Sequence, residues 1–92
     1  MNKTELATAL AERVSVSNDD ALKMLNAFTD IVAEQLSEGG DVTIIGFGAF
    51  RVQSRPERQG RNPRTGEPII IPARNTPSFR AGKGLRDAVN HK

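Results

Sequence analysis

The sequence predicts an α+β fold with a two-helix N-terminal base, a three-stranded antiparallel sheet that carries an extended β-arm, and a short C-terminal helix. Apolar residues recur at helical spacing over about the first 40 residues. From Val42 onward the period changes to two, which is typical of strands with one buried face. Between Arg55 and Pro68 there is no aromatic or branched aliphatic side chain, so this segment cannot build a core.

The first helix is predicted over residues 3–14. Leu6 and Leu10 lie one helical turn apart on its apolar face. Asn2 and Glu5 have the spacing of a capping box, in which each side chain accepts a hydrogen bond from the other residue's backbone N–H. The helix should therefore begin directly after Asn2.

The second helix is predicted to begin at the N-cap Ser17, to run to about Ser37 and to stop at Gly39-Gly40. Its apolar side chains cover about half of the circumference, whereas an ordinary surface helix has a stripe of roughly 100°. They are Leu22, Met24, Leu25, Phe28, Ile31, Val32 and Leu36. A second subunit would cover this face; the alternative is a lone helix that its own chain wraps well.

Three strands are predicted in the second half of the chain, with a turn at Gly46-Phe47-Gly48. They are expected at Val42–Ile45, at Ala49–Arg55, and from Ile69 onward. Pro72 should lie at a bulge or an edge of the third strand, and Pro77 should end it. The middle strand separates apolar Phe50 and Val52 on one face from polar residues on the other. The polar residues are Arg51, Gln53 and Arg55.

Ninety-two residues allow one domain, which we expect to span residues 1–92. About 1–40 should be a helical dimerisation part, and about 41–92 should hold the sheet, a β-arm over 55–70 and the terminal helix. Leu85, Ala88 and Val89 predict that last helix, which two glycines weaken.

Composition argues against several functional classes. The chain has no cysteine, so it offers no disulfide and no thiolate metal site, and we expect no metal and no cofactor. The single histidine, His91, is expected to be a solvated tail residue, which leaves no Ser/His/Asp or Cys/His set for catalysis. Because no catalytic set is present, we expect the protein not to be an enzyme. The N-terminus does not resemble a signal peptide and no apolar run could span a membrane, so we expect the protein to be soluble and cytoplasmic.

Charge is divided unevenly along the chain. Residues 1–46 carry three basic and eight acidic side chains, a net charge of −5, whereas residues 47–92 carry ten basic and three acidic ones, a net charge of +7. Such asymmetry indicates an acidic scaffold that presents a basic surface to a polyanion. The alternative is a basic face that is merely solvated.

The segment RPERQGRNPRTGEP places an arginine at every third position, at Arg55, Arg58, Arg61 and Arg64. In an extended ribbon this spacing alternates between faces, which suits a groove with charged walls on both sides. The DNA minor groove, about 6 Å wide, is such a groove and attracts arginine. Gly60 would let the backbone come close, and Pro63 would be an apolar wedge able to enter a base step. A disordered loop with solubilising charge is the alternative.

The second half of the chain closely resembles the bacterial histone-like HU proteins and their relative, integration host factor. The resemblance is carried by Gly46-Phe47-Gly48, Gly60-Arg61-Asn62-Pro63, Thr65-Gly66-Glu67, Pro77, Phe79 and Ala81-Gly82-Lys83, and it extends to the opening MNKTEL. It implies an intertwined dimer with a helical base, whose two β-arms embrace DNA. Gly84 departs from the larger helix former expected there, which puts the stability of the last helix in doubt.

The resemblance also implies roles for individual residues. Phe47, Phe50 and Phe79 would form the aromatic core between subunits, together with Phe28, Val32 and Leu36 of the second helix. Pro63 would be the intercalating residue at the arm tip. Arg55, Arg58, Arg61, Asn62 and Arg64 would line the arm, Arg51, Gln53 and Arg74 would face DNA from the sheet, and Lys3, Arg80, Lys83 and Arg86 would meet flanking phosphates.

Together these features predict a homodimeric protein that binds and bends double-stranded DNA through the minor groove with little sequence specificity, and so compacts the bacterial nucleoid. One alternative is a subunit of a site-preferring heterodimer like integration host factor, paired with a paralogous subunit. Another, from a different class, is an RNA-binding module, although the wide, shallow minor groove of RNA suits an inserted ribbon poorly.

Overall fold

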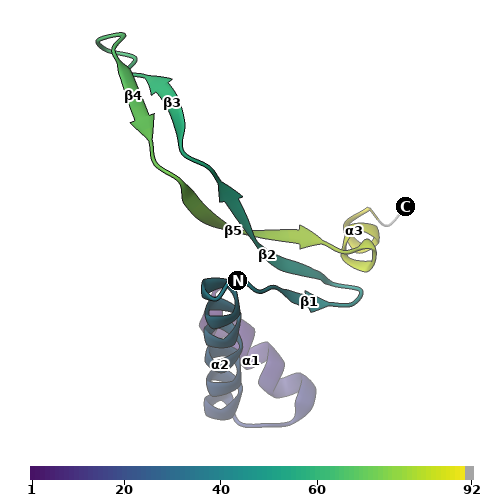
Figure 1. The fold of residues 1–92 in the computed structure, drawn as a ribbon. Helices are drawn as coiled ribbons and strands as arrows, with labels where there is room; N and C mark the ends of the chain where they lie inside the picture. Colours follow the sequence, from purple (N-terminus) through teal and green to yellow (C-terminus); the bar gives the residue numbers. More distant parts are fainter. Residues whose placement is uncertain (91–92) are drawn as a thin grey trace.

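The structure, a computed structural model, describes residues 1–90, so His91 lies outside the described residues. Two helices form a base, a sheet lies above them, and a long hairpin rises away from both (Figure 1). The elements are α1 (Lys3–Val14), α2 (Asn18–Ser37), β1 (Val42–Ile44), β2 (Gly48–Arg55), β3 (Arg58–Arg61), β4 (Pro68–Ile71), β5 (Arg74–Ala81) and α3 (Lys83–Val89). The predicted α+β fold is confirmed.

The bounds of α1 and α2 follow from local caps. The Glu5 N–H donates to Asn2 Oδ1 at 2.8 Å, and the Asn2 N–H donates to Glu5 Oε1 at 3.1 Å, so the predicted capping box is present. The Ser17 hydroxyl accepts from the Asp20 N–H at 3.0 Å and opens α2. Gly39, at φ 82°, lies just beyond the end of α2 in the left-handed region that glycine adopts without strain.

The strands form two sheets. The first is antiparallel with the order β1-β2-β5, and the second consists of β3 and β4 alone. The pair β3–β4 is the predicted β-arm, here called the arm, and it projects beyond the base (Figure 1). The chain is therefore elongated, with extents of 59 × 36 × 27 Å and a radius of gyration of 19.0 Å. A compact chain of this length would have a radius of gyration of about 12 Å.

Both long strands break at the same level, where the arm meets the first sheet. The last pair of that sheet is Arg55 with Arg74, and the first pair of the arm is Arg58 with Ile71. Each break contains a proline, Pro56 or Pro72, which has no N–H to contribute to a ladder. The strand expected from Ile69 onward is therefore two strands, β4 and β5.

The expected ends of two strands were wrong. Pro77 does not end a strand but pairs with Val52 in the middle of β5. Because β5 is an edge strand, every second amide points away from β2, and a proline is tolerated there. Ile45 lies in the turn rather than in β1 and is 97% exposed, whereas Gly48 opens β2 instead of closing the turn.

The helix α3 is held against the turn between β1 and β2. The Gly82 N–H donates to the Phe47 carbonyl oxygen at 2.7 Å. A Cβ on Gly84 would lie 2.5 Å from the Gly46 carbonyl oxygen, so the absence of a side chain lets α3 approach the turn this closely. The glycine that departs from the expected helix former thus has a packing reason.

The hydrophobic core of one chain is unfinished. Among residues 1–90, the buried hydrophobic side chains are all alanines, and no large side chain is fully buried. They are Ala7, Ala11, Ala21 and Ala49. The apolar face of α2 remains open, since Met24 is 53%, Phe28 40% and Ile31 55% exposed. The two helices pack on each other through alanines, with Leu22 and Leu25 partly buried against them, and leave other large side chains exposed.

Candidate nucleic-acid interface

One face of the first sheet is polar and basic, and is here called the saddle. Directly paired residues of antiparallel strands point to the same face. Arg51 pairs with Ser78, Gln53 with Thr76, Arg55 with Arg74 and Ala49 with Arg80. All four predicted arginines of this sheet, together with Gln53, therefore share one face, away from the face that carries Phe50 and Val52.

Three residues of the saddle were missing from the sequence-based set. Thr76 and Ser78 lie opposite Gln53 and Arg51, and Thr43 of β1 lies opposite Ala49. The period-two pattern of β5 could have revealed Thr76 and Ser78. The expected strand end at Pro77 accounts for Ser78, which follows it, but not for Thr76, which precedes it.

Arg55 and Arg74 form a like-charge pair at the root of the arm. They are directly opposite each other on neighbouring strands and both are exposed. Like charges in this position destabilise a sheet. No carboxylate within residues 1–90 forms an ion pair with either guanidinium. A bound anion would relieve their repulsion.

The arm carries arginine on both of its faces. In β3, Arg58 pairs with Ile71 and Arg61 with Pro68, three positions apart and thus on opposite faces. The alternation expected from the spacing of three is confirmed for this pair. Beside Gly60 the end of the Ile71 side chain lies 3.0 Å from where a Cβ would stand. The close approach of the Gly60 backbone to DNA stays a prediction.

The tip of the arm is a hydrogen-bonded turn. The Asn62 N–H donates to the Glu67 carbonyl oxygen and the Gly66 N–H to the Asn62 carbonyl oxygen, both at 2.8 Å. Asn62 Oδ1 accepts from the Arg64 N–H at 2.8 Å, and Arg61 Nη1 donates to the Gly66 carbonyl oxygen at 3.0 Å. Arg61 Nη1 and Asn62 Oδ1 are therefore engaged in hydrogen bonds of the turn, while the Asn62 side-chain N–H₂ remains available to donate.

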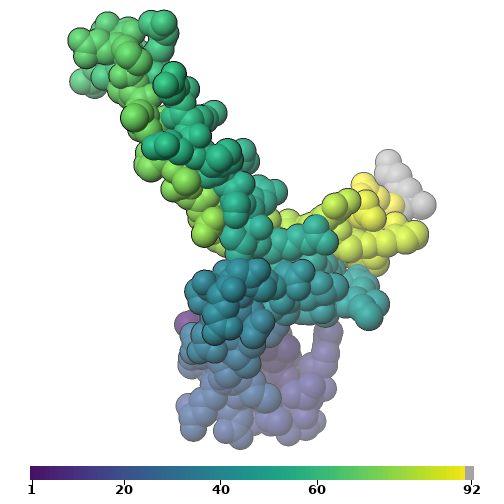
Figure 2. All heavy atoms as spheres, in the orientation of Figure 1, coloured from purple at the N-terminus to yellow at the C-terminus, as the bar shows by residue number. Residues whose placement is uncertain are grey.

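Pro63 lies within this turn and is exposed. This turn is the far end of the arm, which stands clear of the base in Figure 2. A proline here leaves no unsatisfied N–H. The turn thus presents an apolar side chain between two arginines, Arg61 and Arg64.

Most of the basic side chains have no acidic partner. Within residues 1–90, ion pairs join only Lys23 to Asp19 and Lys83 to Asp87, and both pairs are exposed. Among the described residues, the arginines of the arm and saddle therefore form no ion pair with a carboxylate. An exposed cluster of this kind is the electrostatic footprint of a polyanion-binding surface.

A third group of basic residues lies at the end of the sheet away from the arm (Figure 1). Lys83 and Arg86 belong to α3, and Arg80 ends the basic face of β5. A groove of about 260 Å³ lies between Arg80, Arg86 and the β1–β2 turn. Lys3 lies apart from these, in the first turn of α1 on the base, so α3 and Lys3 do not form one cluster.

The residues expected at a subunit interface come together on the other face of the sheet. Ring centroids are 6.2 Å apart for Phe28 and Phe50, 4.9 Å for Phe50 and Phe79, and 5.5 Å for Phe79 and Phe47. Beside them an apolar groove of about 530 Å³ lies between α2 and the sheet, lined in part by Val32 and Leu36. The rings meet within one chain, yet Phe28, Phe47 and Phe79 remain 40–44% exposed.

The described residues offer neither a metal site nor a membrane-spanning helix. No group of three or more His, Cys, Asp or Glu side chains within residues 1–90 could hold a metal ion. In the same part of the chain, no helix is both long and apolar enough to cross a membrane.

Comparisons with known proteins agree with this geometry. The family described as bacterial DNA-binding protein matches residues 1–90. DNA-binding protein HU-beta 2 of Neisseria meningitidis is 52% identical over 90 residues, which cover 98% of this chain and 99% of that protein. DNA-binding protein HU-1 of Halalkalibacterium halodurans is 53% identical over 89 residues, with coverage of 97% and 99%.

Solved structures with the same fold include two HU proteins. The chain matches an HU–DNA cocrystal structure from Anabaena with a TM-score of 0.86 and 45% identity, covering 97% of both chains. HU from Thermotoga maritima matches with a TM-score of 0.70 and 27% identity, covering 97% of this chain and 98% of that one.

Proposed function

Because the chain belongs to the HU family of bacterial DNA-binding proteins, we propose that it is a histone-like architectural protein that binds and bends double-stranded DNA. The observation that carries the proposal is the division of the sheet into two faces. The saddle carries arginines that form no ion pair within the described part of the chain, and an open apolar surface occupies the opposite face. The first face suits a polyanion and the second suits another protein surface.

The open apolar surface is proposed to pack against a second copy of the chain. Phe28, Phe47 and Phe79 keep 40–44% of their surface exposed, and the 530 Å³ groove beside α2 is largely apolar. A chain of this size without disulfides has few other ways to complete a core. The dimer would hold Phe28, Val32, Leu36, Phe47, Phe50 and Phe79 in one shared core.

The two arms of such a dimer would enter the minor groove from both sides. Arg58 and Arg61, on opposite faces of the arm, would each approach one wall of the groove. Arg55 and Arg64 would extend the contact towards the saddle and the tip, and Asn62 would donate from its free amide. Arg51, Gln53 and Arg74 would face the duplex from the saddle.

Phosphates beyond the saddle would meet Lys3, Arg80, Lys83 and Arg86. DNA would have to bend to reach α3, because α3 lies at the end of the sheet away from the arm (Figure 1). Pro63 would hold a kink by entering a base step, at a cost of a few kcal/mol that the added contact surface repays.

Sequence preference would be weak. The minor groove presents a degenerate pattern of donors and acceptors, and arginine responds to its width more than to its bases. Affinity would come mainly from phosphate neutralisation and counterion release. We therefore propose that the protein compacts and stabilises the bacterial nucleoid in the cytoplasm, without a cofactor and without catalytic activity.

One binding experiment tests the DNA part of the proposal. Gel-shift titrations would compare an intact duplex, the same duplex with a central nick, and an RNA duplex of the same length. We expect affinity to be highest for nicked DNA, lower for intact DNA and lowest for duplex RNA, because a nick lowers the work of bending. Tighter binding to duplex RNA than to either DNA would contradict it.

The dimer has its own test. Sedimentation at micromolar concentration should give twice the mass of the chain, and the thermal midpoint should rise with protein concentration, since association stabilises only the folded state. A monomer whose midpoint does not change with concentration would contradict the shared core.

A further inference from the structure

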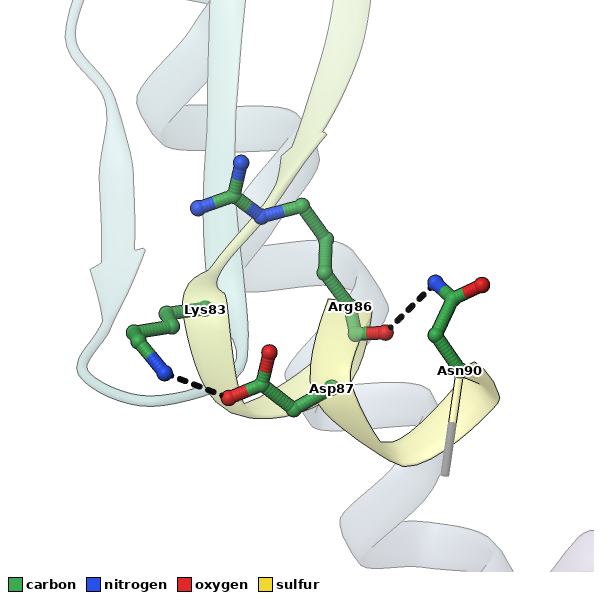
Figure 3. A network of polar contacts seen from close by, with 4 residues as sticks. All are labelled: Lys83, Arg86, Asp87 and Asn90. Atoms are coloured by element: carbon green, nitrogen blue, oxygen red, sulfur yellow. Dashed lines mark hydrogen bonds and ion pairs between the residues drawn. The ribbon is translucent and has the colours of Figure 1, made fainter. Parts of the chain in front are cut away.

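Within residues 1–90, Lys83 is the one basic residue of the proposed DNA surface that forms an ion pair with an acidic residue. Its Nζ lies 2.6 Å from Asp87 Oδ2, one helical turn away (Figure 3). Both side chains are largely exposed, at 82% and 62%. The neighbouring Arg86 extends its guanidinium away from Asp87, and neither Arg86 nor Arg80 forms an ion pair with a residue in the range 1–90.

The pair is poorly placed to stabilise α3. A helix dipole favours acidic residues near the N-terminus and basic residues near the C-terminus. Here Lys83 is the first residue of a seven-residue helix and Asp87 lies in its last turn, which is the less favourable order. The C-terminus is instead capped by Asn90 Nδ2, which donates to the Arg86 carbonyl oxygen at 2.9 Å.

Asp87 also stands out in the charge pattern. It is the only acidic residue after Glu67 in the sequence, in a stretch that also carries Arg74, Arg80, Lys83, Arg86 and Lys92. A negative charge at this position opposes the approach of a polyanion. Among the described residues, its side chain makes a polar contact only with Lys83.

We propose that Asp87 competes with DNA phosphate for Lys83 and thereby limits how strongly the region around α3 holds the flanks of a bent duplex. This inference rests on the proposed function. Lys83 must leave Asp87 before it can pair fully with a phosphate. Part of the binding free energy gained from each flank contact is therefore cancelled. The arms and saddle, whose arginines have no such competitor, bind without this cost.

The expected size of the effect follows from the exposure of the pair. Exposed ion pairs are weak, so releasing Lys83 should strengthen binding by about two- to fivefold for each protomer. Salt screens the intrahelical pair as well as the phosphate contact. Removing Asp87 should therefore also make log affinity fall more steeply with log salt.

The test uses Asp87→Asn in the full chain, with two duplexes. One is short enough to end beneath the saddle, and the other is long enough to bend back to α3. We expect the variant to bind the long duplex about two- to fivefold more tightly per protomer than the parent, and the short duplex equally well. Unchanged affinity for the long duplex would overturn the proposal.

The chain provides a matched control for the loss of negative charge. Asp19 forms an equally exposed pair with Lys23 across one turn of α2, at 3.2 Å, on the helical base. Asp19→Asn should leave affinity for both duplexes within about twofold, since an isolated surface charge away from the site contributes little. An equal gain from both variants would show that only net charge matters.

A double-mutant cycle separates competition for Lys83 from a general field of Asp87. In a Lys83→Gln background, Asp87→Asn should no longer strengthen binding to the long duplex. A gain that persists without Lys83 would overturn the competition. Parent protein that binds neither duplex would instead contradict the proposed function, so the two failures are distinguishable.

Discussion

The helical base and the arm are both incomplete, but in different ways. The base, formed by α1 and α2, satisfies its helix caps and leaves its large apolar side chains exposed. The arm closes its turn with a set of local hydrogen bonds, and its arginines form no ion pair with any residue that the structure describes. One region lacks apolar cover, and the other lacks counter-charge.

This difference indicates what each region binds. Exposed apolar surface is covered most favourably by another apolar surface, and a second copy of the chain would carry the same apolar patch. Exposed guanidinium groups, which are planar and carry several N–H donors, gain most from a polyvalent anion such as a phosphate backbone. Stability should therefore depend on the base and the sheet face beside it, whereas DNA affinity should depend on the arm and the saddle.

The largest expected effect is on stability. Phe50→Ala removes a ring that lies against both Phe28 and Phe79, so we expect the free energy of unfolding to fall by about 3–5 kcal/mol. Urea-induced unfolding at fixed protein concentration measures it. Ile70→Ala, on the arm and 67% exposed, is the control and should change that free energy by less than about 0.5 kcal/mol. Equal losses from both variants would remove the contrast between the two regions.

The next effect is on the salt dependence of DNA binding. Arg58→Ala should make the slope of log affinity against log salt shallower by about one unit, or two if both copies contact phosphate. Arg58 is a cleaner choice than Arg61, because Arg61 also donates to the Gly66 carbonyl oxygen in the turn.

The control for Arg58 is Arg13→Ala, which removes the same charge from the exposed end of α1. Its slope should equal that of the parent protein. If Arg58→Ala and Arg13→Ala shift the slope equally, net charge rather than the arm determines binding, and the contrast fails.

The smallest expected change in affinity is for Pro63→Ala. The turn should persist, since its bonds between Asn62, Gly66 and Glu67 do not involve the proline. Every arginine is kept, so affinity for linear DNA and the salt slope should stay close to those of the parent. Bending should be lost, seen as a longer end-to-end distance by energy transfer across a short duplex, together with the preference for nicked DNA. Full bending by the variant would make Pro63 only a turn former.

The helices were the most predictable part of the fold because their ends depend on neighbours in sequence. The interval expected for the first helix, residues 3–14, is the one that α1 occupies, since the partners of the capping box are three residues apart. The polar face of β2 was predictable for the same reason. Alternation along a single strand requires no knowledge of its neighbours.

The strand breaks and several residues of the candidate site were less predictable. Pro77 is compatible with β5 only because β5 has one neighbour, and strand order cannot be deduced from a local pattern. The pairing of Arg55 with Arg74 depends on register between strands separated by the whole arm. The Lys83–Asp87 pair, by contrast, has the i,i+4 spacing that a sequence displays.

The sequence by itself determined the helix bounds, the two chemical faces of β2, the arginine spacing of the arm and the family resemblance. These depend on interactions between residues a few positions apart, or on the order of side chains along one strand. Only the tertiary structure decided which arginines share the saddle and where the arm separates from the sheet. It also decided which atoms lie beside Gly60 and Gly84, and how much of each phenylalanine stays exposed. Those outcomes depend on which distant segments pair and how closely they pack, because strand register and packing join residues that no local pattern connects.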